Sequence, residues 1–275
     1  MRGAEDCKAG TATGLCVISV PKSGTMFLSR YLERVSGLPV VFGLEGVGQS
    51  RLAAEIDGRE HPLIKASRHP GSLATATRRY ALMLSRNRQQ VDRLGLDAPR
   101  LYSDHGFHNF LRFLLDPRPD EIVSPEEILS WAEARRLRVC YLYRDLGAIL
   151  VSLANFLSAG KSFLLSIDGL ENAMNLSVEL YAPVLAAHIE AWRPFFSDPR
   201  LMVTTYKELT TEPAAIVSRV AAGGGIPLLP DAQLIDEASE YKPWTYRGGK
   251  KLSWRDSMAP RHIDALTERY PSLMS

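Results

Sequence analysis

The chain has 275 residues, of which 45% are hydrophobic and 23% are charged. This length and composition allow a large buried core and exclude a disordered, collagen-like or disulfide-stapled protein. Lysine and arginine total 33 against 31 aspartate and glutamate residues, for a formal net charge of +2. Such a balance is not that of a general nucleic-acid binder, so we expect no nucleic-acid partner and look for local anion sites instead.

The cysteines and the N-terminal residues bear on the compartment. Cys7, Cys16 and Cys140 are too few and too poorly spaced for a disulfide framework or a zinc site. Glu5 and Asp6 stand where a signal peptide has basic residues before an apolar run. No apolar stretch reaches the roughly 18 residues of a transmembrane helix. We therefore predict a cytoplasmic protein with no transmembrane segment and no bound metal.

The first half of the chain begins with a clear strand, turn and helix. Residues 15–20 form a short apolar run that is typical of a buried parallel strand. The turn 21–25 follows, and apolar residues then recur at helical spacing over 26–35. Shorter strands are expected at residues 62–65 and 100–103.

The second half repeats this alternation. A helix is expected after Ser124, a capping residue that precedes a proline at the first helical position. A strand over 139–143 leads into a helix over 148–157. A further strand over 201–206 precedes a helix that the glycines 223–225 would end.

Alternating strands and helices predict an α/β fold, with a central parallel sheet flanked by helices on both faces. We find no internal repeat, low-complexity tract or linker-like change of composition. Residues 1–275 are therefore expected to form a single domain, with residues 1–13 as a flexible N-terminal segment.

The turn after the first strand has the form of a phosphate-binding loop. The first free N–H groups of a helix point at a bound anion, and Val20-Pro21-Lys22-Ser23-Gly24-Thr25 places such a helix start directly after a strand. Gly24 permits close approach of the backbone, and Lys22 supplies a positive charge. The hydroxyls of Ser23 and Thr25 can donate to phosphate oxygens. Taken alone, an ordinary strand-to-helix turn is the alternative.

A nucleoside triphosphatase or kinase would instead require G-x-x-x-x-G-K-[ST] directly after a strand. Gly160-Lys161-Ser162 supplies the end of that motif. The leading glycine is absent, because residue 155 is asparagine, and the triplet follows the predicted helix over 148–157 rather than a strand. We therefore predict no Walker A loop at this position.

A second anion-binding pair follows the strand over 139–143. An arginine at the carboxyl end of a strand can bind a phosphate through two hydrogen bonds, and a serine in the next helix can add its hydroxyl. Arg144 and Ser152 have these positions. Both would lie at the same sheet edge as Lys22. Pairing of Arg144 with Asp145 is the structural alternative.

Together these residues resemble a known family. The residues 20–25, with Tyr143-Arg144-Asp145 and Ser152, resemble the 5′-phosphosulfate loop and the 3′-phosphate motif of sulfotransferases that use 3′-phosphoadenosine 5′-phosphosulfate (PAPS). Thr205-Tyr206-Lys207-Glu208-Leu209, followed by Glu212-Pro213, is similar to the family's Tyr-Glu-Asp-Leu and Asp-Pro signature.

A fourth motif lies near the C-terminus. Residues 245–250, with Trp254-Arg255 just beyond, resemble the family's Phe-Arg-Lys-Gly segment, which closes over the 3′-phosphate. The four motifs occur in the family's order and span most of the chain. Two departures stand out: Phe27 replaces a tryptophan after the loop, and Gly248 replaces the lysine of Arg-Lys-Gly.

The resemblance implies a P-loop-like sulfotransferase that transfers a sulfuryl group from PAPS, without a metal, to a hydroxyl or amine of a small-molecule, lipid or glycan acceptor. An ATP-dependent phosphoryl transferase on a related fold and a catalytically inactive nucleotide-binding protein are the alternatives. The donor-binding residues that the resemblance implies are Pro21, Lys22, Ser23, Gly24, Thr25, Met26, Arg144, Ser152, Tyr206, Arg247, Gly248 and Gly249.

The catalytic residues expected are His105 and Lys22. His105 follows a predicted strand, as in the family's strand-then-His-Leu-Pro element, and the pKa of histidine suits a base at neutral pH. Two departures accompany it: Gly106-Phe107 replaces Leu-Pro, and Ser103 replaces a lysine. His69, which follows another short strand, is the alternative base.

Other aromatic and histidine side chains near the motifs have no assigned chemistry. His108, His188 and His262 are expected to pack in the core or lie at the surface. Four phenylalanines fit either an apolar part of the acceptor or the core: Phe107, Phe110, Phe156 and Phe163.

Overall fold

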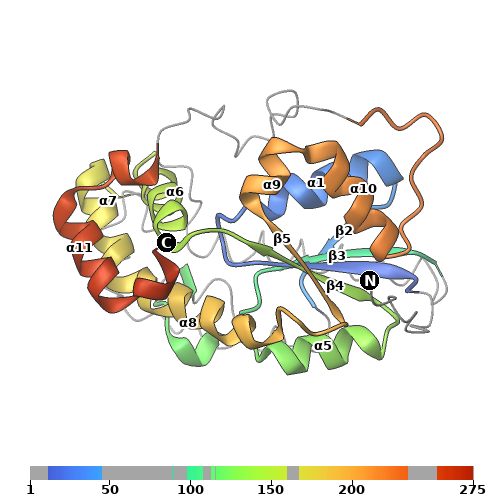
Figure 1. Ribbon diagram of the computed structural model, residues 1–275, viewed down its shortest axis with the longest axis horizontal. Helices are drawn as coiled ribbons and strands as arrows, with labels where there is room; N and C mark the ends of the chain where they lie inside the picture. Colours follow the sequence, from blue (N-terminus) through green and yellow to red (C-terminus); the bar gives the residue numbers. More distant parts are fainter. Residues whose placement is uncertain are drawn as a thin grey trace, which may run out of the picture.

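Five parallel strands form the centre of the fold, in the order β2-β3-β1-β4-β5 (Figure 1). The computed structural model describes residues 12–44, 89, 98–107, 113–114, 116–159, 167–234 and 253–274. The strands are β1 (Gly14–Ile18), β2 (Val40–Phe42), β3 (Arg100–Asp104), β4 (Arg138–Tyr143) and β5 (Leu201–Thr205). The predicted α/β fold with a parallel sheet is confirmed.

Strand β1 occupies the middle of the sheet. Its Val17 is in register with Ser103 of β3 on one side and with Cys140 of β4 on the other. All five residues of β1 are buried, as the apolar run in the sequence predicts. The turn that leaves β1 therefore starts from the centre of the carboxyl edge of the sheet, where the loops that follow its neighbours converge.

Four of the predicted strands agree with β1, β3, β4 and β5 to within two residues at their ends. The strand expected at residues 62–65 lies outside the described residues. Strand β5 ends at Thr205 rather than at Tyr206, because the Thr205 hydroxyl accepts a hydrogen bond from the N–H of Glu208 and so starts a helix. Tyr206 is therefore the first residue of a helix and not the last of a strand.

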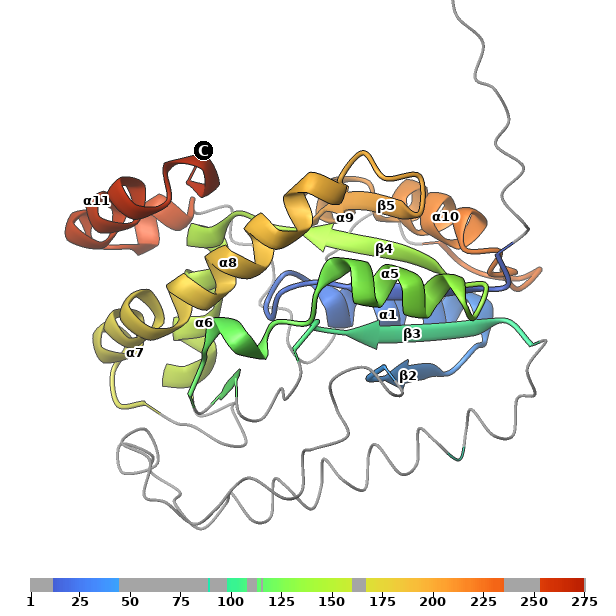
Figure 2. The same cartoon turned by 90° about the horizontal axis from the view of Figure 1, so that it is seen from below.

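Helices cover both faces of the sheet (Figures 1 and 2). On one face lie α1 (Thr25–Ser36), α9 (Tyr206–Thr211) and α10 (Pro213–Gly223). On the other face lie α5 (Pro125–Glu133) and the end of α8 (Ala182–Trp192). Each face has its own buried cluster, and this confirms helices on both sides of the sheet.

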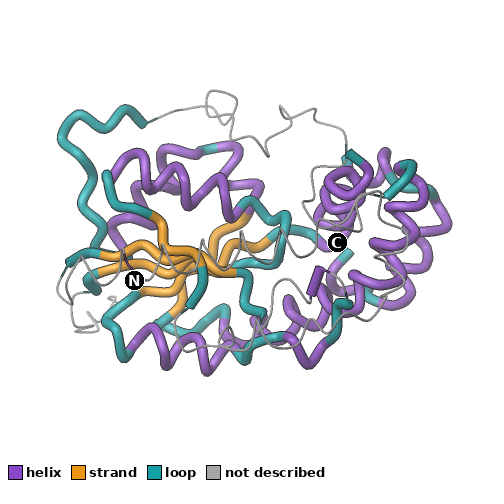
Figure 3. Tube along the Cα trace, turned by 180° about the vertical axis from the view of Figure 1, so that it is seen from behind, coloured by secondary structure: helices purple, strands orange, loops and turns teal. Residues whose placement is uncertain are grey.

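A second group of helices packs beyond the carboxyl ends of the strands (Figures 2 and 3). It consists of α6 (Leu146–Ser158), α7 (Leu170–Leu176), a π-helical turn (Ser177–Tyr181), the start of α8, and α11 (Pro260–Arg269). The predicted helix over 148–157 lies within α6. Short 3-10 turns complete the described structure: Pro119–Glu121, Arg193–Phe195, Trp254–Ser257 and Pro271–Leu273.

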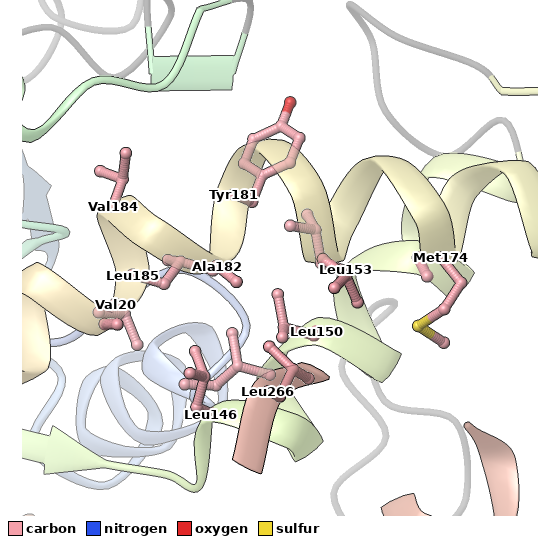
Figure 4. Packing of buried hydrophobic residues seen from close by; sticks show 14 of the residues in the cluster. Val20, Leu146, Leu150, Leu153, Met174, Tyr181, Ala182, Val184, Leu185 and Leu266 are labelled. Atoms are coloured by element: carbon pink, nitrogen blue, oxygen red, sulfur yellow. The ribbon is translucent and has the colours of Figure 1, made fainter. Parts of the chain in front are cut away.

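The core of this helical group includes the residue that opens the loop after β1. Val20 packs in one cluster with Leu146 and Leu150 of α6, Leu185 of α8 and Leu266 of α11 (Figure 4). The loop is therefore held between the sheet and the helical group. In the described part of the chain, no helix has the length and hydropathy required to cross a membrane.

Candidate active site

The predicted site residues lie just after four neighbouring strands. Lys22 follows β1, His105 follows β3, Arg144 follows β4 and Tyr206 follows β5. Two hydrogen bonds join these segments: Arg144 Nη1 donates to the carbonyl of Lys22 at 2.7 Å, and His105 Nδ1 lies 3.2 Å from the carbonyl of Ser19. Ligands of open α/β sheets bind outside the carboxyl ends of the strands, and this is that edge.

The loop after β1 adopts a backbone that few sequences tolerate. Lys22 has φ 71° and Gly24 has φ 97°, both in the left-handed region. For Lys22 this conformation is unfavourable, and the hydrogen bond from Arg144 to its carbonyl helps to hold it. A Cβ atom at Gly24 would lie 2.6 Å from Cδ2 of Tyr206. Glycine is therefore required at this position both for its backbone and for its lack of a side chain.

Gly24→Ala is expected to lower the free energy of unfolding by about 3 kcal/mol, because strain at positive φ adds to overlap with the Tyr206 ring. Gly37→Ala is the matched control. Gly37 has φ 70°, but its Cβ would meet only Leu229, at 3.6 Å. We expect about 1 kcal/mol there. Urea unfolding measures both variants, and equal losses would contradict the close packing of Tyr206 on Gly24.

Two buried polar atoms at this loop lack a partner among the described residues. They are Ser23 Oγ, in a fully buried residue, and Nε of Arg144. The hydroxyl of Thr25, in contrast, pairs with the hydroxyl of Ser19. A buried donor without a partner costs about 1–3 kcal/mol, so a ligand with acceptor oxygens would be stabilised here. The donor set fits the phosphate groups that the sequence predicts.

Arg144 is held by stacking rather than by an ion pair. Its guanidinium lies 4.2 Å from the centre of the Tyr206 ring, and the edge of that ring lies beside Gly24. Burial lowers the pKa of the Arg144 guanidinium. In the described part of the chain, no salt bridge joins Arg144 to Asp145, the alternative partner considered from the sequence. Among the described residues, the planar guanidinium is therefore oriented without a direct ion pair, although the nearby charge of Asp145 acts on it.

Helix α6 faces the loop through Phe156. Nζ of Lys22 lies 4.1 Å from the centre of the Phe156 ring, a cation–π contact. Ser152 lies one turn earlier on the same side of α6, and it is partly buried. Phe107, in contrast, is only 1% exposed and stacks on Phe113, so it belongs to the core. Phe110 and Phe163 lie outside the described residues.

The ring of His105 has a defined tautomer. A carbonyl oxygen can only accept, so the contact with the carbonyl of Ser19 places the proton on Nδ1 and leaves the lone pair on Nε2. Burial lowers the pKa of His105 to about 4, and the nearby charge of Lys22 adds to that effect. At neutral pH the imidazole is therefore unprotonated, as a general base requires.

The turn that carries His105 is built by its neighbours. The N–H of Gly106 donates to Oδ1 of Asp104 at 2.6 Å, so Asp104 shapes the turn. Ser103 accepts a hydrogen bond from the hydroxyl of Ser29 in α1 at 2.9 Å. The Ser103 hydroxyl therefore binds α1. It does not supply the positive charge of the lysine that the family resemblance leads us to expect at this position.

Several predicted residues lie outside the described residues: His69, Arg247, Gly248 and Gly249. The chain that follows the last three is described from Ser253, and Trp254 packs on α6. A Cβ atom at Gly147 would lie 2.6 Å from the Trp254 ring. Among the described residues, no group of three or more histidine, cysteine, aspartate or glutamate side chains has an arrangement that could hold a metal ion.

A family model described as the sulfotransferase domain matches residues 13–243. The chain belongs to this family. The solved structure of mouse sulfotransferase SULT7A1 complexed with PAP is similar, with a TM-score of 0.55 and 12% identity over 95% of this chain and 84% of that chain. Retinol dehydratase, solved with androsterone and the inactive cofactor PAP, has a TM-score of 0.52 and 14% identity over 96% and 81%. No curated protein matches the sequence.

The sulfotransferase family confirms the resemblance drawn from the four motifs, and the solved structures confirm the fold. The geometry adds contacts that the motifs do not reveal. Ser19 supplies the carbonyl for His105, and Phe156 contacts the amino group of Lys22. In the sequence, the position of Ser19 directly after a buried strand is a weak signal for its contact with His105. The contact of Phe156 with Lys22 is signalled only by the i, i+4 spacing of Phe156 from Ser152.

This sulfotransferase is expected to lose stability in acid. Burial lowers the pKa of His105 to about 4 and that of His188 to about 3, below the usual histidine value. The unfolded chain then binds more protons than the folded one below about pH 6.5. The free energy of unfolding therefore decreases as the pH is lowered. At about pH 5 the two histidines together cost about 4 kcal/mol relative to neutral pH.

Urea unfolding of wild type and His188→Gln, at neutral pH and at about pH 5, measures this effect. Glutamine does not titrate, so the variant should lose about half of the acid-induced destabilisation. An equal loss in both proteins would show that His188 is not held neutral by the fold.

Proposed function

We propose that this sulfotransferase transfers a sulfuryl group from PAPS to a hydroxyl or amine of a small-molecule, lipid or glycan acceptor. The observation that carries the proposal is the loop after β1: within the described residues the buried Ser23 hydroxyl and Nε of Arg144 have no hydrogen-bond partner, and the charge of Lys22 lies near the neutral His105. PAP, the product that such a donor leaves, is bound in the solved structures of mouse SULT7A1 and retinol dehydratase.

The donor would be divided between two sets of residues. Residues 21–26 would hold the 5′-phosphosulfate, since the N–H groups at the start of α1 and the Ser23 hydroxyl can donate to an anion bound there. Arg144 and Ser152 would bind the 3′-phosphate, joined by residues 247–249, which lie outside the described residues. Tyr206, stacked between Gly24 and the guanidinium, would border the adenine. This remote binding energy serves positioning.

In the chemical step, His105 would accept the proton of the acceptor through Nε2, because Nδ1 is committed to Ser19. Bound PAPS supplies an activated sulfur with an anionic leaving group. Lys22 would stabilise the negative charge that grows on that leaving oxygen, a contribution of about 3 kcal/mol for a preorganised donor. We propose that Lys22 and Arg144 together serve in place of a metal cation.

The protein is proposed to act in the cytoplasm. Cys16 and Cys140 are both buried and free, on the neighbouring strands β1 and β4. Two thiols kept apart in this way suit a reducing compartment.

The test is transfer of radiolabelled sulfate from PAPS to a panel of phenols, sterols, amines, lipids and oligosaccharides, with chelator present throughout. The proposal predicts a labelled product and one equivalent of PAP for at least one acceptor class. Phosphoryl transfer from ATP that requires Mg²⁺ would contradict it in favour of a kinase-like enzyme. Tight binding of PAP without turnover on any class would indicate an inactive nucleotide-binding protein.

A further inference from the structure

A column of packed rings lies beneath the turn that carries His105. His188 of α8 is at its centre: its ring lies 6.0 Å from that of Tyr141 in β4 and 5.3 Å from that of Phe107, measured between centroids. Trp192 continues the column, 5.0 Å from Tyr141. All four side chains are at most 1% exposed. The sequence predicts that His188 packs in the core or lies at the surface; in the structure it packs in the core, and its ring brings two polar nitrogens into this apolar column.

The two nitrogens of His188 have different surroundings. Nδ1 lies 3.4 Å from the hydroxyl of Tyr141, whereas Nε2 makes no hydrogen bond of normal geometry within the described residues. A buried ring nitrogen without a partner is costly, so its direction matters. Nε2 points at the turn after β3, since a Cβ atom at Gly106 would lie 2.8 Å from it.

Both backbone polar groups of Gly106 in this turn are already hydrogen-bonded. The N–H of Gly106 donates to Asp104, and the carbonyl of Gly106 accepts from the N–H of Val123 at 2.9 Å. The backbone of His105 raises the pKa of His188, against the larger effect of burial. Together with the position of Nε2 against Gly106, this effect places the His105–Gly106 peptide beside the His188 ring. The Tyr141 hydroxyl can donate to Nδ1, and the neutral ring then carries its proton on Nε2, toward that peptide.

We propose that His188 is a positioning residue for His105: Tyr141 fixes its tautomer, and its Nε2–H and ring edge fix the peptide that joins His105 to Gly106. Gly106, with φ 67°, is the matching half of this contact, because no side chain fits between its backbone and His188. With that peptide held, the ring of His105 keeps Nδ1 on the carbonyl of Ser19 and Nε2 toward the acceptor.

The catalytic part of this inference rests on the proposed function, but the positioning does not. Three variants separate the contributions. His188→Phe keeps a ring in the column and removes both nitrogens. His188→Gln keeps an amide nitrogen near the position of Nε2, and Tyr141→Phe removes only the hydroxyl that sets the tautomer.

The measurement is the NMR spectrum of the ring nitrogens in protein labelled with nitrogen isotope at histidine, assigned with His105→Gln, alongside kcat and the KM for PAPS. Wild type and His188→Gln are expected to show one tautomer of His105, protonated at Nδ1. His188→Phe should show both tautomers and a kcat reduced about 30-fold, with KM for PAPS within about twofold, as for a misplaced catalytic group. Tyr141→Phe should lie between them.

A His105 tautomer and a kcat that are unchanged in His188→Phe would overturn the proposal. So would equal losses in His188→Phe and His188→Gln, which would mark a purely structural role. The spectrum requires neither donor nor acceptor. A tautomer that depends on residue 188 in a protein without turnover would therefore support the positioning and contradict the proposed function. Should His188→Phe not fold, Tyr141→Phe provides the same comparison by loss of one oxygen.

Discussion

His105→Ala is expected to lower kcat by about 1,000-fold, within the usual range for loss of a general base, while affinity for PAP changes by less than about twofold. The separation follows from the geometry. His105 follows β3 and binds the carbonyl of Ser19, whereas the proposed phosphate ligands follow β1 and β4. Alanine removes Nε2, the ring nitrogen that would take the acceptor proton, and leaves the loop of Lys22 in place.

Single-turnover kinetics with an active acceptor, together with PAP titration, measure the two effects. His262→Gln is a suitable control, because His262 lies in α11 and pairs with Asn175 in α7, away from the loops after the strands. It should retain wild-type kcat. A His105→Ala protein with kcat within about tenfold of wild type would reject His105 as the base and direct attention to His69.

Lys22→Met is expected to lower kcat by about 100-fold, because it removes the cation that would stabilise the leaving oxygen. The substitution isolates the charge. Methionine keeps the unbranched stem and the Cβ, so the strain at φ 71° is unchanged, and the Lys22 carbonyl that Arg144 binds belongs to the backbone. The contact with Phe156 loses its cation but keeps its apolar part.

Lys207→Met is the matched control, since Lys207 is an exposed lysine near the same edge of the sheet, in the first turn of α9. Loss of a solvated charge there should change kcat by less than about twofold. Steady-state rates at saturating PAPS compare the variants. Equal effects at the two positions would mean that Lys22 contributes only to the general potential of the surface.

The sequence predicts the parts of this protein that depend on local patterns. The apolar run before Lys22, the glycine at position 24 and the helical spacing after it are contiguous, so strand, loop and helix follow from neighbouring residues alone. The same holds for Arg144, directly after β4. The parallel arrangement of the strands then brings these loops to one edge of the sheet, as the structure confirms.

What the sequence does not predict depends on contacts between distant segments. Strand β2 has only three residues, too few for a periodic signal, and its place at the edge follows from pairing with β3. Glycine is needed at position 24 because the ring of Tyr206, distant in sequence, packs against it. Glycine is needed at position 106 because the ring of His188 packs there. In each case a small residue and a ring fit each other in three dimensions, and neither sequence position carries a pattern that names its partner.

The most direct test of the central claim is calorimetric binding of PAP to the purified protein in the presence of chelator, with ATP and Mg²⁺ as the comparator. We expect tight, metal-independent binding of PAP and weak binding of ATP. Arg144→Ala should weaken PAP binding by about 100-fold, the effect of losing a charged hydrogen-bonding partner. Arg261→Ala, which removes an exposed arginine paired with Glu171, should leave it unchanged. Preference for ATP with Mg²⁺, or PAP binding that is indifferent to Arg144, would contradict the donor site at the carboxyl edge of the sheet.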